Sequence, residues 1–164
     1  MALDFEIRVG LGHDTHRLQR GGPLRLGGIN IDFDGHLDGH SDADVLLHAI
    51  TDAILGAANQ GDIGELFPDT DAVNAGKDSA EMLSVANERI RGAGWQIMNL
   101  DCVVLAERPK LLPHRASICQ RIAEILSINP DQVSLKGKTG ERSGDIGQGK
   151  VMQSICTCLL RRNK

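Results

Sequence analysis

The stretch that decides the fold is "SDADVLLHAITDAILGAAN", residues Ser41–Asn59. Its apolar residues recur every three or four positions, which is the spacing of one helix face. These residues are Val45, Leu46, Ala49, Ile50, Ala53 and Ile54. Ser41 and Asp44 resemble a capping box with Asp in place of Glu, so we expect a helix that begins after Ser41 and ends at about Asn59. A helix this apolar must pack against another layer of structure.

Strand patterns precede this helix. Apolar residues alternate with polar or small ones from Ile7 to Leu11, which predicts a strand that carries "GHDTH", Gly12–His16, at its C-terminal end. The stretch "LRLGGINI", Leu24–Ile31, is typical of a β-hairpin that turns at its two central glycines.

Further helices and strands are expected after this helix. In order, they are a Gly- and Asp-rich loop at 60–77, a helix from a cap at Asp78 or Ser79 to Gly94, a strand at 96–106, a loop with two prolines at 107–114, a helix that stops before Asn129, a strand at 132–138, a Gly-rich loop at 139–149 and a strand at 150–160. No repeat and no linker divides the chain. The pattern predicts an α+β fold: a small mixed β-sheet layered against three helices, in a single domain over residues 1–164.

Composition narrows the function. The chain has 164 residues, of which 41% are hydrophobic, enough for the core of one domain. A formal net charge of −4, with three Phe, one Trp and no Tyr, argues against a nucleic-acid surface, which needs positive charge and stacking rings. No leader pattern and no membrane-length apolar run is present, so we expect a cytoplasmic protein that binds a small molecule. Its four cysteines form no CxxC pair and are expected to be buried, reduced thiols.

Asp14, His16 and His48 are the candidate metal ligands. In an extended segment residues i and i+2 point to the same side, so Asp14 and His16 can reach one ion. His48 can join them from the predicted helix, with Asp44 or Asp52 holding its other ring nitrogen. One Asp and two His with an open position form the ligand set of a catalytic zinc site. On these residues alone, a capped strand end and a half-buried helix histidine fit equally well.

Other polar residues favour phosphate chemistry. His40 and Ser41 stand at the predicted helix N-terminus, where free backbone N–H groups attract an anion. In the long loop, Asp62, Asp69 and Asp71 suit the hydroxyls of a ribose or a diol, although such a cluster is most often a solvated loop.

The last loop contains a second polar cluster. Lys136, Lys138, Thr139 and Glu141 surround two glycines, where they can contact phosphates and a harder cation such as Mg²⁺. A Gly-rich loop between strands is by itself more often a simple connection.

Three blocks of the sequence together carry a family resemblance. They are "GLGHDTHRL", "HSDADVLLHAITDAILGAANQGDIGELFPDTD" and "ERPKLLPH". They closely resemble the 2-C-methyl-D-erythritol 2,4-cyclodiphosphate synthases of the non-mevalonate isoprenoid pathway, in register from about Ile7 to the C-terminus. The resemblance implies an enzyme, a metal-dependent phosphorus–oxygen lyase. Its implied reaction closes 4-diphosphocytidyl-2-C-methyl-D-erythritol 2-phosphate into 2-C-methyl-D-erythritol 2,4-cyclodiphosphate with loss of CMP.

The resemblance also implies the roles of individual residues. Its metal ligands are Asp14, His16 and His48 for one catalytic Zn²⁺ per subunit, and Glu141 for a substrate-bridging Mg²⁺ or Mn²⁺. Its catalytic residues, which steady the transition state, are His40 and Thr139. Its substrate contacts are Ser41 at the phosphates, Asp62, Ile63 and Gly64 at the ribose or methylerythritol, the flap residues Phe67, Pro68, Asp69, Thr70 and Asp71, and the cytosine-pocket residues Ala106, Pro109, Lys110, Leu111 and Leu112. From its place in the last loop, Lys138 is a further candidate substrate contact.

The implied assembly is a homotrimer with active sites at the subunit interfaces, without a nucleic-acid or membrane partner. The substrate's own 2-phosphate attacks the β-phosphorus, so no protein nucleophile is required. A phosphate monoester with a second pKa near ~6 is already largely ionised at neutral pH, so no strong general base is required either. The protein then supplies positioning and charge neutralisation.

The chain departs from the family mostly in the last loop. Lys138 and Gly140 stand where the family usually has threonines, which predicts an altered phosphate contact with the chemistry retained. Asp145 and Gln148 replace a phenylalanine and an arginine that in many members line a cavity on the trimer axis, thought to hold an isoprenoid diphosphate. We therefore do not expect such a ligand here.

Two other functions fit parts of the pattern. A zinc-dependent phosphohydrolase would use metal-bound water and leave linear products. A non-enzymatic, metabolite-binding zinc protein would have no use for an open coordination position, and a closed cysteine-rich site would favour it.

Overall fold

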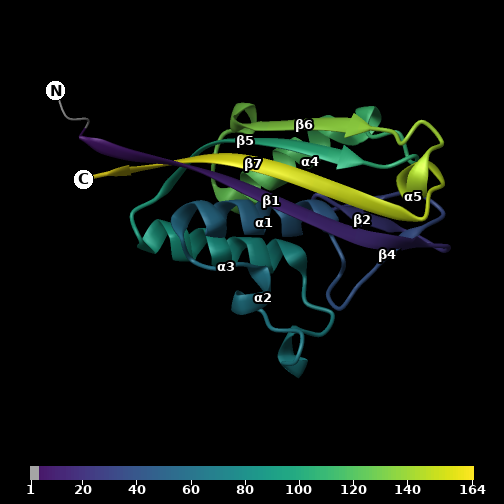
Figure 1. The fold of residues 1–164 in the computed structure, drawn as a ribbon, viewed down its shortest axis with the longest axis horizontal. Coiled ribbons are helices and arrows are strands. Elements are labelled where there is room, and N and C mark those ends of the chain that lie inside the picture. Colours follow the sequence, from purple (N-terminus) through teal and green to yellow (C-terminus); the bar gives the residue numbers. More distant parts are fainter. Residues whose placement is uncertain (1–3) are drawn as a thin grey trace.

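The computed structural model describes residues 4–164 and is built around a mixed five-stranded sheet of order β4-β1-β7-β5-β6 (Figure 1). Its strands are β1 (Phe5–Gln19), β4 (His36–Asp38), β5 (Gln96–Leu105), β6 (Val133–Lys138) and β7 (Val151–Asn163). The long strands β1 and β7 pair antiparallel, whereas β5 and β6 pair parallel. A separate hairpin, β2 (Leu24–Leu26) and β3 (Ile29–Ile31), turns as predicted at Gly27 and Gly28, both at positive φ.

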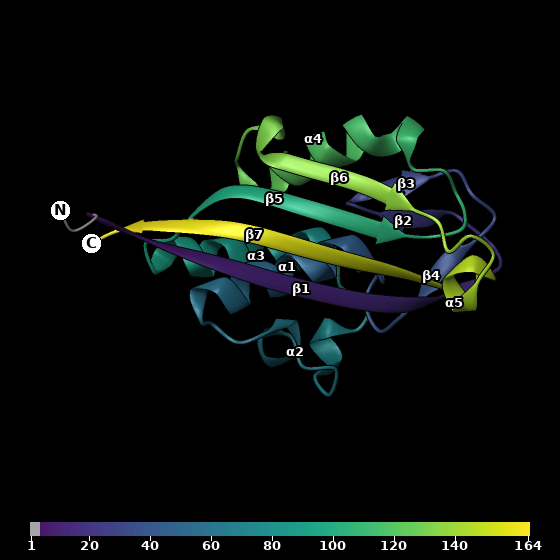
Figure 2. The same ribbon diagram turned by 45° about the horizontal axis from the view of Figure 1, so that its top comes forward.

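Three long helices cover one face of this sheet (Figures 1 and 2). They are α1 (Val45–Ala58), α3 (Ser79–Gly92) and α4 (Arg115–Leu126), and they confirm the three predicted helices. Two four-residue helices, α2 (Ile63–Leu66) and α5 (Gly144–Gly147), lie inside segments predicted as loops. One core forms between the long helices and the sheet, and the α+β class is confirmed.

The start of α1 differs from the prediction. Its N-cap is Asp44, not Ser41, and the helix begins at Val45. The Asp44 carboxylate is fully buried and accepts hydrogen bonds from Leu47 N at 3.1 Å, Gly27 N at 2.9 Å and Gly28 N at 2.7 Å. One side chain therefore caps the helix and holds the hairpin, and Ser41 is left outside the helix. The predicted end at Asn59, in the left-handed conformation, is confirmed.

The strand β1 runs past "GHDTH" to Gln19, so this stretch lies within the strand and not at its end. Its apolar residues face away from the helices: Ile7, Val9 and Leu11 are 50%, 72% and 67% exposed. On the opposite face, a Cβ on Gly10 or Gly12 would come within 1.9 Å of a carbonyl oxygen of α1. The glycines thus allow the α1 backbone to lie directly on β1, which sets the spacing between strand and helix.

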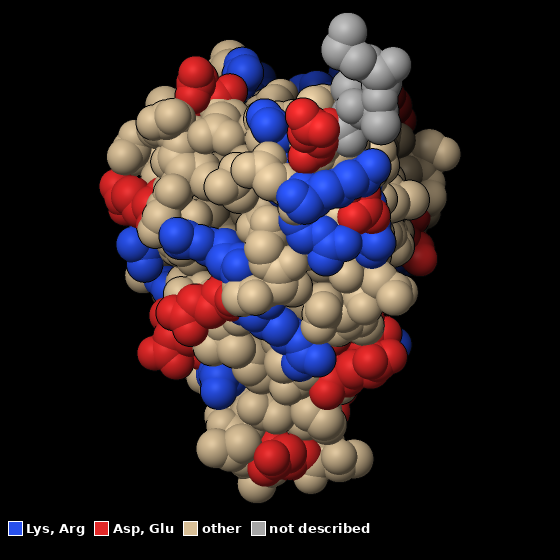
Figure 3. Space-filling view, turned by 90° about the vertical axis from the view of Figure 1, so that its left-hand side faces the viewer, with Lys and Arg blue, Asp and Glu red and all other residues tan. Residues whose placement is uncertain are grey.

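Where β1 begins and β7 ends, Arg8 and Arg162 flank the buried Trp95. Their guanidinium carbons lie 4.8 and 4.5 Å from the ring centroid, and both side chains pair with Glu6. Figure 3 shows basic and acidic side chains mixed on this face. The cluster clamps the ends of β1 and β7 together.

The cysteines and the helices bear on further predictions. The four cysteines are buried and free, as predicted. In residues 4–164 no helix is long and apolar enough to cross a membrane. The cytoplasmic location and the single domain over residues 1–164 stay predictions; residues 1–3 of that domain, and of the segment searched for a leader, lie outside the described residues.

Candidate active site

The structure brings the three predicted metal ligands together. Asp14 and His16 point from β1 toward His48 on α1. The Asp14 Oδ2 atom lies 2.9 Å from His16 Nε2 and 3.0 Å from His48 Nδ1, and these two ring nitrogens are 3.3 Å apart. The close approach of β1 and α1 at the glycines makes this convergence possible.

The hydrogen-bond partner of His16 indicates that a proton or a cation must lie within this cluster. His16 Nδ1 lies 2.8 Å from the carbonyl oxygen of Asp38, and because a carbonyl only accepts, Nδ1 must carry the hydrogen. Its Nε2 lone pair then faces the Asp14 oxygen. Such a contact repels unless a proton or a cation lies between the atoms. One carboxylate and two imidazoles arranged in this way fit a divalent metal such as zinc.

Charges at the cluster shift its pKa values. Burial raises the pKa of Asp14, but the neighbouring His16 and His48 rings outweigh burial and leave this pKa well below its usual range. Burial lowers the pKa of His16, but the hydrogen bond and charge of Asp14 outweigh it, so the pKa is raised. The raised pKa of His16 favours a proton at the position that a metal would take.

A cavity of about 220 Å³ opens beside the cluster. Among the predicted site residues, it is lined by Asp14, His16, His40, Ser41, His48, Ile63, Gly64, Phe67 and Asp69. The predicted ribose or methylerythritol contact Asp62 and the flap residues Pro68, Thr70 and Asp71 are not part of the lining. Asp62 caps α2, and Asp71 caps a short helical turn in the flap. Asn74 and Met82 line the cavity without having been predicted.

Two predictions about this site are wrong. His40 and Ser41 do not stand at the helix N-terminus, because α1 begins only at Val45. The second ring nitrogen of His48 is not held by Asp44 or Asp52. Asp44 binds the helix start and the hairpin, and Asp52 accepts from Ile63 N at 2.8 Å.

Instead, His48 Nε2 lies 2.8 Å from Ser79 Oγ and 3.1 Å from Ser41 Oγ. Sequence reasoning missed Ser79, which stands 31 positions further along the chain. The local sequence indicated only that Ser79 could cap a helix.

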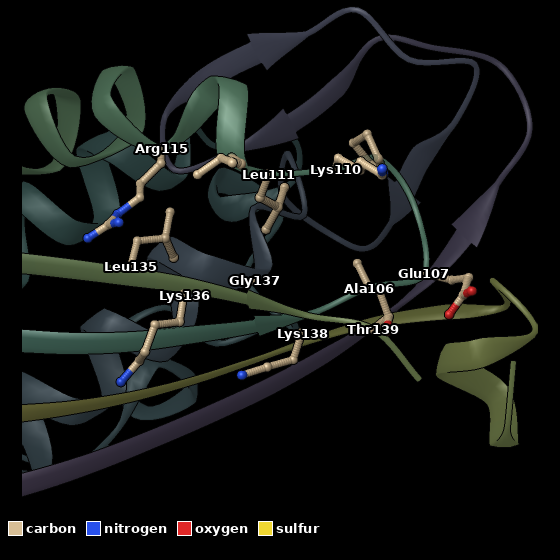
Figure 4. A pocket seen from close by; sticks show the side chains of 12 residues that line it. Ala106, Glu107, Lys110, Leu111, Arg115, Leu135, Lys136, Gly137, Lys138 and Thr139 are labelled. Atoms are coloured by element: carbon tan, nitrogen blue, oxygen red, sulfur yellow. The ribbon is translucent and has the colours of Figure 1, made fainter. Parts of the chain in front are cut away.

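A second cavity, of about 350 Å³, lies at the ends of β5 and β6 (Figure 4). Among the predicted residues, it is lined by Ala106, Pro109, Lys110, Leu111, Leu112, Lys138 and Thr139. Glu107, Arg115, Leu135, Lys136 and Gly137 complete the lining. Figure 4 shows Lys136 and Lys138 extending from the same side of β6. Lys136 is engaged by Asp101, with Nζ 2.6 Å from Oδ1, and this ion pair lowers the pKa of Asp101.

Glu141 lies next to this second cavity in sequence but is not part of its lining. Its Oε1 accepts a hydrogen bond of 2.8 Å from Thr139 Oγ1, and both side chains are solvent-exposed. The two cavities share no lining residue. A ligand that contacts both sets of residues therefore cannot bind within a single cavity of this chain.

Comparisons with known proteins agree on one family. The YgbB family matches residues 7–161. The chain is 51% identical over 158 residues to the 2-C-methyl-D-erythritol 2,4-cyclodiphosphate synthase of Gemmatimonas aurantiaca, covering 96% of this chain and 95% of the relative. It is also 51% identical over 154 residues to that of Treponema denticola, covering 94% and 96%.

Solved structures are similar too. The bifunctional IspDF from Campylobacter jejuni has a TM-score of 0.93 and 39% identity, covering 96% of this chain and 43% of its own. The CDP complex of IspF from Plasmodium falciparum has a TM-score of 0.86 and 35% identity, covering 99% of this chain and 100% of its own.

Proposed function

The chain belongs to the YgbB family and is an enzyme of the non-mevalonate isoprenoid pathway, a 2-C-methyl-D-erythritol 2,4-cyclodiphosphate synthase; we propose that its Asp14, His16 and His48 cluster holds the catalytic Zn²⁺. The observation that carries this proposal is the convergence of one carboxylate oxygen and two imidazole nitrogens within 3.3 Å of one another. A metal ion satisfies all three at once.

The proposed substrate is 4-diphosphocytidyl-2-C-methyl-D-erythritol 2-phosphate. An oxygen of its 2-phosphate forms a bond to the β-phosphorus, and the bond from this phosphorus to the oxygen bridging to CMP breaks. CMP leaves with the electron pair, which makes the enzyme a phosphorus–oxygen lyase. When bound, the zinc ion and a Mg²⁺ or Mn²⁺ ion at Glu141 neutralise charge on the reacting phosphates and on departing CMP.

The residues around the cluster bind and orient the substrate. His40 and Ser41 line the cavity beside the ligands and are proposed to donate hydrogen bonds to the β-phosphate. The flap residues Phe67 and Asp69 line the same cavity and exclude water from the reacting groups. Asn74, nearly buried, donates to the carbonyl of Pro68 at 3.0 Å and thereby holds the flap together.

The second cavity is proposed to bind the cytidine end of the substrate. Its apolar lining residues Leu111 and Leu135 suit a base, and backbone groups around Ala106 can read the base edge. Thr139 and Lys138 lie where the nucleotide phosphates would follow. The Plasmodium falciparum relative was solved as a CDP complex, which supports a cytidine diphosphate ligand for this chain.

We further propose a homotrimer in which the two cavities of neighbouring subunits meet. The support is that the cavities share no residue and that Ile7, Val9 and Leu11 form an exposed apolar row on the sheet face that the helices do not cover. An exposed apolar row of this kind is typical of a surface that packs against another subunit.

Mixing two inactive variants tests the shared sites. His48→Ala removes the metal side, and Glu141→Ala removes the nucleotide side. If sites form between subunits, each site needs an intact His48 from one subunit and an intact Glu141 from its neighbour. After random re-association of equal amounts of the two variants, about one quarter of the sites have both. Each variant refolded alone is the control. Activity that never rises above the two controls would refute shared sites.

A further inference from the structure

We propose that Ser79 is a positioning residue for the metal site, because its hydroxyl links the His48 imidazole to the Asp42 carboxylate and so selects which ring nitrogen of His48 faces the metal. This inference rests on the proposed metal site and assigns a role to two residues outside it.

The contacts form a continuous chain. His48 Nε2 lies 2.8 Å from Ser79 Oγ, and Ser79 Oγ donates a hydrogen bond to Asp42 Oδ1. The other Asp42 oxygen lies 3.4 Å from Nε of Arg25, on the β2 strand. Ser79 is fully buried, so water does not compete for its hydroxyl.

The direction of each hydrogen bond follows from the chemistry of the groups. A carboxylate beside a guanidinium only accepts, so the single hydrogen of Ser79 goes to Asp42. Ser79 Oγ can then only accept from His48, which places the ring hydrogen on Nε2. His48 Nδ1 is left with its lone pair, turned toward Asp14 Oδ2 at 3.0 Å. This is the tautomer that a metal ligand at Nδ1 requires.

The other serine near His48 has a different part in the site. Ser41 Oγ lies 3.1 Å from His48 Nε2 and accepts from Ala43 N at 3.2 Å. With its oxygen used as an acceptor, Ser41 keeps its own hydrogen for the substrate phosphate. Ser79 has no such freedom, because its hydrogen is committed to Asp42.

The capping of α3 argues against a purely structural role for Ser79. The N-cap of this helix is Asp78, whose carboxylate accepts from Ala80 N at 2.7 Å. The Ser79 hydroxyl is therefore not needed to start the helix. Removing it leaves the cap in place and breaks only the link between His48 and Asp42.

The same chain ties the end of the flap to the substrate-binding segment. Asp42 N donates to the carbonyl of Lys77 at 3.2 Å, and Gly76 N donates to the carbonyl of His40 at 2.9 Å. Ser79 follows directly after this junction. The position of His48 is thereby coupled to the base of the flap.

Zinc affinity of purified protein tests the proposal. In competition with a chromophoric chelator, Ser79→Ala should bind zinc about 10- to 100-fold more weakly than the unmodified chain, the usual effect of removing a hydrogen-bond partner of a ligating histidine. The matched control is Ser84→Ala, on the same helix and without a side-chain hydrogen bond among the described residues. This control should leave zinc affinity unchanged.

Nitrogen NMR of the histidine rings gives a readout that helix stability would not move. His48 should carry its hydrogen on Nε2 in the unmodified chain and show mixed tautomers in Ser79→Ala. Should that variant fail to fold, Asp42→Ala should weaken zinc binding in the same way and Asp42→Asn, which keeps an acceptor oxygen, should restore it.

Zinc affinity and tautomer unchanged in both Ser79→Ala and Asp42→Ala would overturn the role of Ser79 while leaving the metal site standing. An equal loss of affinity in the Ser84→Ala control would also overturn it. Absence of zinc binding by the unmodified chain would instead refute the metal site itself.

Discussion

Asp44→Ala is the change whose cost the structure defines best. The Asp44 carboxylate is fully buried and accepts three backbone N–H groups, from Leu47 in α1 and from Gly27 and Gly28 in the hairpin. Alanine leaves all three donors without this acceptor. The helix start and the hairpin are therefore weakened by the same substitution.

The expected loss can be built from these contacts. Losing the helix cap costs about 1 kcal/mol. Each of the two buried hairpin N–H groups left without a partner costs about 1–3 kcal/mol. Allowing for partial relaxation, we expect the free energy of unfolding to fall by about 4 kcal/mol. For a chain of this length, that lowers Tm by about 8–16 °C.

Differential scanning calorimetry at one fixed protein concentration measures this loss. The matched control is Asp52→Ala, on the same helix, which removes the acceptor of one backbone N–H, that of Ile63. It should cost only about 1 kcal/mol. A Tm for Asp44→Ala no lower than that of Asp52→Ala would show that Asp44 does not stabilise both the helix start and the hairpin.

Three further predictions test other parts of the molecule. Gly12→Ala should lower the free energy of unfolding by about 3 kcal/mol in urea titrations, because its Cβ would lie 1.9 Å from the Ala49 carbonyl; a loss under about 1 kcal/mol would contradict this packing. Lys138→Met should weaken CDP binding about fivefold by calorimetry, whereas Lys136→Met, whose ammonium is held by Asp101, should change it less than about twofold; equal effects would contradict the assignment. Burial raises the pKa of Cys158 to about 11, so this thiol should react with Ellman's reagent at pH 8 far more slowly in folded than in unfolded protein; similar rates would contradict its burial.

Local patterns were enough to predict the regular elements. The apolar face of α1, the paired glycines of the hairpin and the Asp78 cap of α3 are each encoded within a few neighbouring residues. The choice of N-cap for α1 was not, because Ser41 and Asp44 are both good caps. The deciding contact comes from the hairpin N–H groups, 16 and 17 positions away.

The alternation in β1 had a similar limit. A period of two predicts a strand but not which face meets the helices. Here the glycines, not Ile7, Val9 and Leu11, face α1, because only glycine permits so close an approach of the helix backbone. The three-residue strand β4 and the four-residue helices are too short to leave a periodic signal.

In the candidate site, too, some residues could be predicted from local spacing and others could not. Asp14 and His16, two residues apart on one strand, could be paired from spacing alone. His48 was a candidate third ligand from its place on the predicted helix, and the family resemblance strengthened that assignment. Ser79 and Asp42 could not be placed at the site, because their approach to His48 depends on how the loop 60–77 returns to α3. Hydrogen-bond partners that come from distant segments are set by the whole fold.

Phosphorus NMR of the products tests ring closure at the metal site most directly. The purified protein is incubated with 4-diphosphocytidyl-2-C-methyl-D-erythritol 2-phosphate, zinc and magnesium, beside a Glu141→Ala control. We predict the coupled signals of a cyclic diphosphate together with CMP, and their loss in the control. Linear phosphate products would indicate a zinc phosphohydrolase, and unchanged substrate would indicate a metabolite-binding protein; either result would contradict the account.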